Sequence, residues 1–252
     1  MKQVTFSSSD DACDYLITYI INKINSFKPT ASRPYVLGLP TGSSPEGIYA
    51  KLIEAYKAGQ ITFKNVVTFN MDEYLGLPPT NDQSYHYFMY NKLFNHIDIP
   101  KKNINILNGL TTDVEKECRD YERKIKKYGR IHLFLGGLGP EGHLAFNEAG
   151  STRTSITRKV GLVESTIKAN SRFFENDEAK VPRSALSVGI STIIDNSDEI
   201  ALIVLGASKI FALDKTINGK KCDERYPSSY LQDHNRVMIV CDNAAAGLKS
   251  KL

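Results

Sequence analysis

The sequence has few cysteines, no long apolar run and no strong excess of charge of one sign. Its 4 cysteines lie far apart and form no C-x-x-C pair, so neither a disulfide framework nor a cysteine zinc site is indicated. No apolar run approaches the roughly 18 residues that a membrane-spanning helix needs, and the N-terminus lacks a signal-peptide core. We therefore expect a reducing, cytoplasmic location and no membrane partner.

The charge balance argues against nucleic acid as a partner. The net charge is +4 and is dispersed along the chain, whereas nucleic-acid modules carry a basic stripe with aromatic residues among it. The densest basic run, 124–130, has the pattern of an exposed helix end. With 41% hydrophobic and 24% charged residues, the composition is that of a globular protein with a sizeable core.

Short apolar runs alternate with amphipathic segments along the chain. Each run is continuous, as expected of a strand covered on both faces. We predict an α/β fold: a Rossmann-like, open, mainly parallel sheet with helices on both faces. Residues 1–252 are predicted to form one domain, with a polar, mobile, lid-like insert at about 151–182. The predicted strands are Tyr35–Leu39, Val66–Met71, Ile131–Leu135, Ile200–Leu205 and Val237–Cys241, and predicted helices begin near Ser7, Ser44, Thr112 and Ala207.

The segment after the first predicted strand is a candidate anion site. Ligands of open α/β sheets bind outside the carboxyl ends of the strands, so residues there come first. Thr41, Gly42 and Ser43 precede a predicted helix, where free backbone N–H groups and the helix dipole favour an anion. A plain capping turn explains the same residues equally well. No Gly-Lys-Ser/Thr follows, so ATP is not indicated.

Asp72 and Glu73 follow the second predicted strand. Either carboxylate is a candidate general base near a substrate carbon. The alternative is that one of them caps the following turn, and this segment alone favours that alternative.

A glycine-rich loop after the third predicted strand carries His143 between Glu141 and Glu148. A carboxylate that accepts a ring N–H would orient the imidazole for acid–base work, although a histidine in such a loop is often only polar. The formal G-x-G-x-x-G match at 137–142 is discounted because an anion, Glu141, stands where pyrophosphate would bind. We expect neither NAD nor a metal, since the other histidines are scattered.

Two basic residues are candidates for binding a phosphate. Arg172 lies in the polar insert, and Lys209 lies just after the fourth predicted strand. Arginine offers a bidentate fork and lysine a point charge. Ordinary surface charge is the alternative for both.

Together these segments resemble the glucosamine-6-phosphate deaminase (glucosamine-6-phosphate isomerase) family. The resemblance extends from about residue 8 to residue 242. It is carried by the runs Leu37–Ser43, Val67–Tyr74, Gly142–Glu148, Asn170–Phe174 and Val181–Gly189.

The resemblance implies an enzyme that needs no cofactor and turns glucosamine 6-phosphate and water into fructose 6-phosphate and ammonia, in amino-sugar catabolism. By this analogy His143 assists ring opening, oriented by Glu141 and Glu148, and Asp72 moves a proton between C2 and C1. The residues that would bind the phosphorylated amino sugar are Thr41, Gly42, Ser43, Tyr85, Arg172 and Lys209.

The sequence departs from the family pattern at several positions. Residue 141 is Glu where the family usually has Asp, and we expect activity to persist. Arg158-Lys159-Val160 and an end at Leu252 differ from members that carry an allosteric site, so that regulation is not expected. The oligomeric state, including a homo-oligomer, is open. Two other functions compete: a 6-phosphogluconolactonase-type hydrolase and a sugar-phosphate sensor that binds without turnover.

Overall fold

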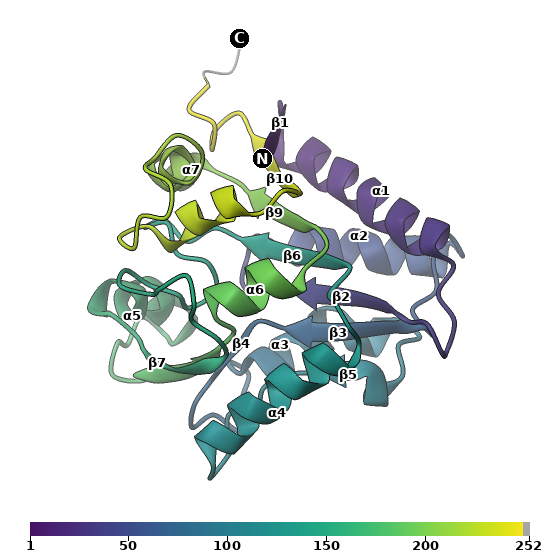
Figure 1. Cartoon of the computed structure of the whole chain (residues 1–252), viewed down its shortest axis with the longest axis horizontal. Helices are drawn as coiled ribbons and strands as arrows, with labels where there is room; N and C mark the ends of the chain where they lie inside the picture. The colour runs from purple at the N-terminus through teal and green to yellow at the C-terminus, as the bar shows by residue number, and fades with distance from the viewer. Residues whose placement is uncertain (249–252) are drawn as a thin grey trace.

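Seven parallel strands form the central sheet of the computed structural model, which describes residues 1–248 (Figure 1). The last four residues of the predicted domain therefore lie outside the described residues. Every strand pair is parallel, in the order β1-β10-β9-β6-β2-β3-β5, which confirms the predicted sheet. The strands are β1 (Lys2–Phe6), β2 (Tyr35–Leu39), β3 (Val66–Asn70), β5 (Ile104–Asn105), β6 (Leu133–Gly137), β9 (Ile200–Val204) and β10 (Val237–Asp242).

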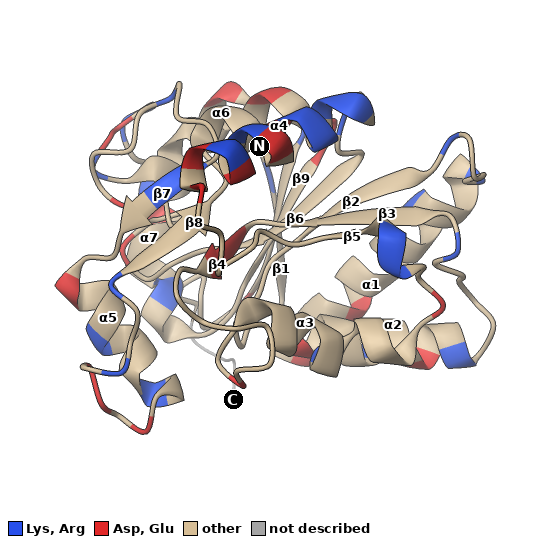
Figure 2. Ribbon diagram, turned by 90° about the horizontal axis from the view of Figure 1, so that it is seen from below, with Lys and Arg blue, Asp and Glu red and all other residues tan. Residues whose placement is uncertain are grey.

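Helices cover both faces of this sheet, as predicted. Figure 2 shows α1, α2 and α3 on one face and α4 and α6 on the other. The helices are α1 (Ser9–Phe27), α2 (Glu46–Lys57), α3 (Tyr85–Lys92), α4 (Val114–Lys127), α5 (Glu164–Asn170), α6 (Ile190–Asn196) and α7 (Ile210–Ile217). Five 3-10 segments join them in the described chain: η1 (Phe94–His96), η2 (Lys101–Asn103), η3 (Ser171–Phe173), η4 (Ala207–Lys209) and η5 (Pro227–Asp233).

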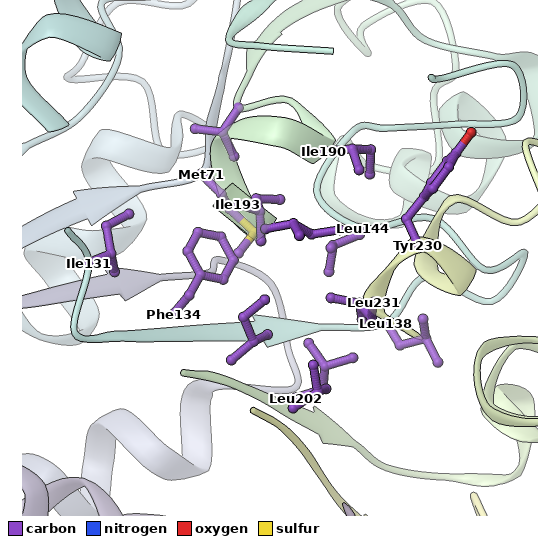
Figure 3. Packing of buried hydrophobic residues seen from close by; sticks show 14 of the residues in the cluster. Met71, Ile131, Phe134, Leu138, Leu144, Ile190, Ile193, Leu202, Tyr230 and Leu231 are labelled. Carbon is purple, nitrogen blue, oxygen red and sulfur yellow. The ribbon is translucent and has the colours of Figure 1, made fainter. Parts of the chain in front are cut away.

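The alternation of side chains along each strand divides the core into two layers. In β6, Phe134 packs into the layer that contains α4 and α6, whereas Leu133 and Leu135 pack into the layer that contains α1 and α2. Figure 3 shows Phe134 beside Met71, with Ile193 and Leu144 nearby in the first layer. Both faces of the central strands are covered, so β2, β3 and β9 are buried at every position and consist mainly of apolar residues, which is why their sequences predicted them.

The boundaries of one predicted strand are wrong. The run Ile131–Leu135 was expected, but β6 is Leu133–Gly137, and Ile131 makes only an isolated bridge to Ser197. The strand continues through Gly136 and Gly137, which pair with Leu202 and Ile203 of β9. A Cβ on Gly136 would lie 2.8 Å from Leu202 Cδ2, so glycine at this position leaves room for that side chain. The sequence analysis placed the end of this strand before Gly136, whereas in the structure Gly136 is part of the strand and pairs with Leu202 of β9.

A small antiparallel sheet lies beside the carboxyl edge of the large one. It consists of β4 (Asp72–Tyr74), β8 (Ser184–Ser187) and β7 (Arg158–Gly161), in that order. Only Met71 separates β3 from β4, so the chain runs from one sheet directly into the other. The sequence analysis did not predict this second sheet.

The insert at 151–182 has structure of its own. It contains β7, α5 and η3, and it contributes Leu162, Ile167, Phe174 and Val181 to a third hydrophobic cluster with Tyr74 and Phe146. No helix within residues 1–248 is long and apolar enough to cross a membrane.

Candidate active site

A cavity of about 430 Å³ opens at the carboxyl edge of the large sheet. It lies where the strand order reverses, because β2 is followed outward by β3 and β5 while β6 returns to its other side. Ligands of open α/β sheets bind at this switch point. The cavity brings together nine of the ten predicted site residues: Thr41, Gly42, Ser43, Asp72, Tyr85, Glu141, His143, Arg172 and Lys209. Glu148 does not line it.

The loop after β2 presents free backbone donors to the cavity. Gly42 has φ +94°, a left-handed conformation that favours glycine. Within residues 1–248, no hydrogen bond uses the backbone N–H of Gly42, Ser43 or Ser44. The helix α2 begins at Glu46, directly after the predicted start at Ser44-Pro45, and within residues 1–248 no side chain caps it at Pro45. These free donors favour the anion site over the capping turn.

Two cations line the same cavity. Lys209 donates from Nζ to the carbonyl oxygen of Leu138 at 2.6 Å. Burial, and then the charge of Arg172, lower the pKa of Lys209 to about 8. The guanidinium of Arg172 lies 4.6 Å from the ring centroid of Phe173 in the insert. A phosphate between these cations would relieve their mutual repulsion.

Asp72 is the first residue of β4 and is only 5% exposed. Its Oδ1 is buried and has no hydrogen-bond partner among residues 1–248. Burial, and then the charge of Glu73, raise its pKa well above the usual value. A carboxylate that lines a cavity with an unpaired oxygen and a raised pKa is suited to accept a proton from carbon.

Glu73 faces the other side of β4 and is 2% exposed. Its carboxylate accepts hydrogen bonds from the backbone N–H groups of Tyr85 at 2.9 Å and His86 at 2.8 Å. The capping alternative therefore describes Glu73, which caps α3. Sequence reasoning did not separate the two acids, although the alternation along a strand was a signal that they point to opposite sides.

An aromatic wall closes one side of the cavity. The ring of Tyr85 lies 4.8 Å from that of Tyr74 and stacks on Phe146 at 6.1 Å, with 9° between the planes. The hydroxyl of Tyr74 accepts a hydrogen bond from Asn170 Nδ2 at 2.8 Å, and this contact joins the wall to the end of α5.

His143 lies in the loop after β6 and lines the cavity. Its ring lies across Gly139, where a Cβ would come within 2.0 Å of Nε2, so the position requires glycine. Burial and the charge of Lys209 lower the pKa of His143 to about 4, and Glu141 opposes this only weakly. The imidazole is therefore neutral at pH 7.

The two glutamates near His143 contact the insert. Glu148 accepts from Thr166 Oγ1 at 2.5 Å and from the N–H of Val163 at 3.0 Å, and Glu141 accepts from Ser165 Oγ at 3.0 Å. The expected hydrogen bond from the imidazole to either carboxylate is not found in the described part of the chain, and both carboxylates instead accept from the start of α5. Residues 1–248 contain no group of three His, Cys, Asp or Glu side chains that could hold a metal ion.

Comparison with known proteins gives a consistent result. A family described as glucosamine-6-phosphate isomerases/6-phosphogluconolactonase matches residues 7–240. A Candida albicans protein named glucosamine-6-phosphate isomerase is 74% identical over 252 residues, which is 100% of each chain. A solved monomeric glucosamine-6-phosphate deaminase is 36% identical, with a TM-score of 0.93 over 99% of this chain and 100% of that chain. A 6-phosphogluconolactonase from Thermotoga maritima, 20% identical with a TM-score of 0.73 over 96% and 99%, shares the fold.

Proposed function

We propose, because this chain belongs to the family of glucosamine-6-phosphate isomerases and 6-phosphogluconolactonases, that it converts glucosamine 6-phosphate and water to fructose 6-phosphate and ammonia. One observation carries the proposal. A loop with free N–H donors, an unpaired carboxylate and a neutral imidazole, from three separate stretches of chain, line one cavity of about 430 Å³.

The phosphate binds at the loop after β2. The N–H groups of Gly42 and Ser43 donate to it, and Arg172 and Lys209 neutralise its charge. This anchor holds the sugar carbons near the acid–base groups, and such positioning contributes a large part of the rate.

His143 opens the sugar ring. Its neutral imidazole takes the proton from the C1 hydroxyl and returns a proton to the ring oxygen, which leaves an open-chain aldehyde. A neutral ring suits this role because it begins as a proton acceptor. The contacts of Glu148 with α5 assign that residue to holding the insert, and this differs from the orienting role expected from the resemblance.

Asp72 then shifts a proton from C2 to C1. The carboxylate takes the C2 proton, the electrons of that C–H bond form a C1–C2 double bond, and the former carbonyl oxygen at C1 takes up a proton. The proton held by Asp72 then returns at C1, while the nitrogen at C2 gives up an N–H proton, which balances the proton taken up by the oxygen. The product is an alcohol at C1 and an imine at C2. Water adds to C2 and ammonia leaves, which gives the ketone of fructose 6-phosphate. Acid–base assistance of this kind contributes about 10²–10⁴-fold to a rate.

We further infer that residues 151–182 act as a lid on a single domain in the cytoplasm. Arg172 and Phe173 of this segment line the cavity, and Glu148 and Glu141 hold its helix. We also infer that a monomer suffices for the reaction, because the proposed phosphate loop, Asp72 and His143 meet in one cavity of the same chain. Light scattering measures the oligomeric state, and activity per chain at several protein concentrations shows whether a monomer is sufficient.

The decisive test is a product assay. The purified protein is mixed with glucosamine 6-phosphate, and ammonia and fructose 6-phosphate are measured in equal amounts over time. Parallel reactions contain 6-phosphogluconolactone. Release of neither product at high enzyme concentration would exclude the deaminase, faster lactone hydrolysis would favour the lactonase, and binding without either reaction would indicate a sensor.

A further inference from the structure

Glu73 is a buried carboxylate that no step of the proposed reaction uses. It follows Asp72 directly in β4, so the two side chains leave the strand on opposite faces. Asp72 lines the cavity, whereas Glu73 turns toward the first turn of α3. A carboxylate that is 2% exposed is costly unless its oxygens are well bonded.

The oxygens of Glu73 are bonded to the backbone on two elements. Oε1 accepts from the N–H of Tyr85 at 2.9 Å and from the N–H of Tyr74 at 2.8 Å, and Oε2 accepts from the N–H of His86 at 2.8 Å. Ser84, the N-cap, accepts from the N–H of Tyr87 at 3.0 Å. The start of α3 is therefore tied to β4 by Glu73.

This tie fixes an aromatic ring of the cavity. Tyr85 is the first residue of α3, and its ring packs against Tyr74 and Phe146 on the cavity wall. The same carboxylate bonds the N–H of Tyr85 and the N–H of Tyr74, two residues after Asp72. The Glu73 carboxylate therefore helps to fix the position of the Tyr85 ring relative to Asp72.

We propose that Glu73 is a positioning residue for this reaction: it holds Tyr85 against the strand that carries Asp72, and its charge acts on Asp72 from the far side of that strand. The inference rests on the proposed function, because it concerns the proton transfer by Asp72. Glu73 need not touch the substrate for either effect.

Glu73 is the charged group that, beside burial, acts on the pKa of Asp72. After burial, it is the second cause that raises the pKa of Asp72. Burial raises the pKa of Glu73 itself to about 7, against the effect of its three N–H donors, so its charge is present mainly above that pH. The other titratable groups near Asp72 are Tyr49 of α2, Tyr74 of β4, Tyr85 of α3 and Tyr121 of α4, with His143 and Lys209 also lining the cavity.

The test is the variant Glu73→Gln, assayed for kcat and KM across pH. The amide keeps the shape and one acceptor oxygen but removes the charge. We expect kcat to fall about tenfold, with KM changed less than about threefold. The acidic limb of kcat/KM should move to lower pH by about one unit, because removing a like charge lowers the pKa of Asp72.

Glu122→Gln is the matched control for a purely structural loss. Glu122 is also buried, at 7% exposure, and accepts from Thr157 N at 2.9 Å and Oγ1 at 2.6 Å and from Thr192 Oγ1 at 2.5 Å, but it does not line the cavity. We expect this variant to lower the Tm while leaving the acidic limb in place. Ser84→Ala loosens the same helix start without removing charge, so it should lower kcat without moving the limb.

The outcomes separate the two proposals. Wild-type protein without deaminase activity sinks the proposed function, whatever the variants do. Active wild type with an unmoved limb and unchanged kcat in Glu73→Gln overturns the role of Glu73. If Glu73→Gln does not fold, Glu73→Asp carries the test: it keeps the charge but shortens the reach, so the limb should stay and kcat should fall, and an unchanged kcat overturns the inference.

Discussion

Two buried carboxylates at opposite edges of the sheet have opposite surroundings. Glu199 lies at the amino edge, just before β9, and its side chain is 9% exposed. It is bonded by Tyr19, by Lys23 at 2.6 Å and by Arg236. Asp72, at the carboxyl edge, is buried to a similar degree but keeps an oxygen without a partner. The carboxylate of Glu199 is fully used by bonds within the protein, whereas that of Asp72 has an oxygen available to a ligand.

The cavities beside them differ much less than the carboxylates do. The cavity at Glu199 has a volume of about 360 Å³ and that at Asp72 about 430 Å³. Volume alone would not identify the reactive edge. The unpaired carboxylate oxygen of Asp72, which belongs to a residue that lines the cavity, does distinguish it, because a ligand there can supply the missing hydrogen-bond partner.

The largest expected effect comes from Asp72→Asn. Because the amide cannot accept the C2 proton, we expect product formation to fall about 10²–10⁴-fold. Binding of glucosamine 6-phosphate, followed by calorimetry, should persist. The Tm should not fall, since the variant removes a buried charge whose pKa burial raises. Normal turnover would show that the unpaired oxygen is not the base.

Glu148→Gln tests whether a carboxylate that is hydrogen-bonded to the insert matters for activity at the carboxyl edge. Losing one of its bonds to Thr166 or Val163 should loosen α5, so we expect kcat/KM to fall about tenfold. Glu141→Gln is the matched control. Glu141 is exposed and, in the part of the chain that the structure describes, accepts a hydrogen bond from Ser165 alone, so this variant should change kcat/KM less than about threefold. Equal, large losses in both variants would instead support the orienting role for His143.

We expect the titration of Lys209 to have a smaller, pH-dependent effect on kcat/KM. Its pKa of about 8 means that the ammonium is charged below pH 8 and is lost as the pH rises through that value. We expect kcat/KM to decline several-fold between pH 7 and 9 through weaker phosphate binding. Lys209→Arg stays charged across this range, so its profile should be flat there. The same decline in the arginine variant would assign the limb to another group.

The smallest effect on activity is expected from Glu199→Gln. Lys23 and Arg236 are partly exposed and can turn to water, so we expect a loss of only about 1 kcal/mol in the free energy of unfolding. Urea unfolding measures this loss. The steady-state kcat/KM should stay within about twofold of wild type, and a large drop would mean that the two edges are coupled.

The sequence predicted the strands that carry a continuous apolar signal. Both faces of β2, β3, β9 and β10 are covered, so every position in them is buried and most positions are apolar. The edge strand β1 is half exposed and was missed, as were β4, β7 and β8 of the small sheet, which have three or four residues each. Strands this short are specified by long-range pairing, which a local pattern does not contain.

The site was predictable where a residue's chemistry follows from its place after a strand. Thr41, Asp72, His143 and Lys209 all follow strands and share one cavity. The partners of the glutamates were not predictable, because Thr166 and Ser165 lie in a segment whose position depends on tertiary contacts. The neutral state of His143 also depends on burial, which sequence proximity to acids does not measure.

The passage from β3 to β4 through Met71 makes Asp72 a member of two assemblies. Asp72 follows β3, the neighbour of the strand β2 whose following loop we propose binds the phosphate. In the small sheet Asp72 pairs with Ser187, which in turn pairs with Arg158 near the start of the insert. A shift of the small sheet would therefore move Asp72, the proposed base, relative to the proposed phosphate site. Evolution of the insert's sequence can retune the chemical step itself as well as access to it.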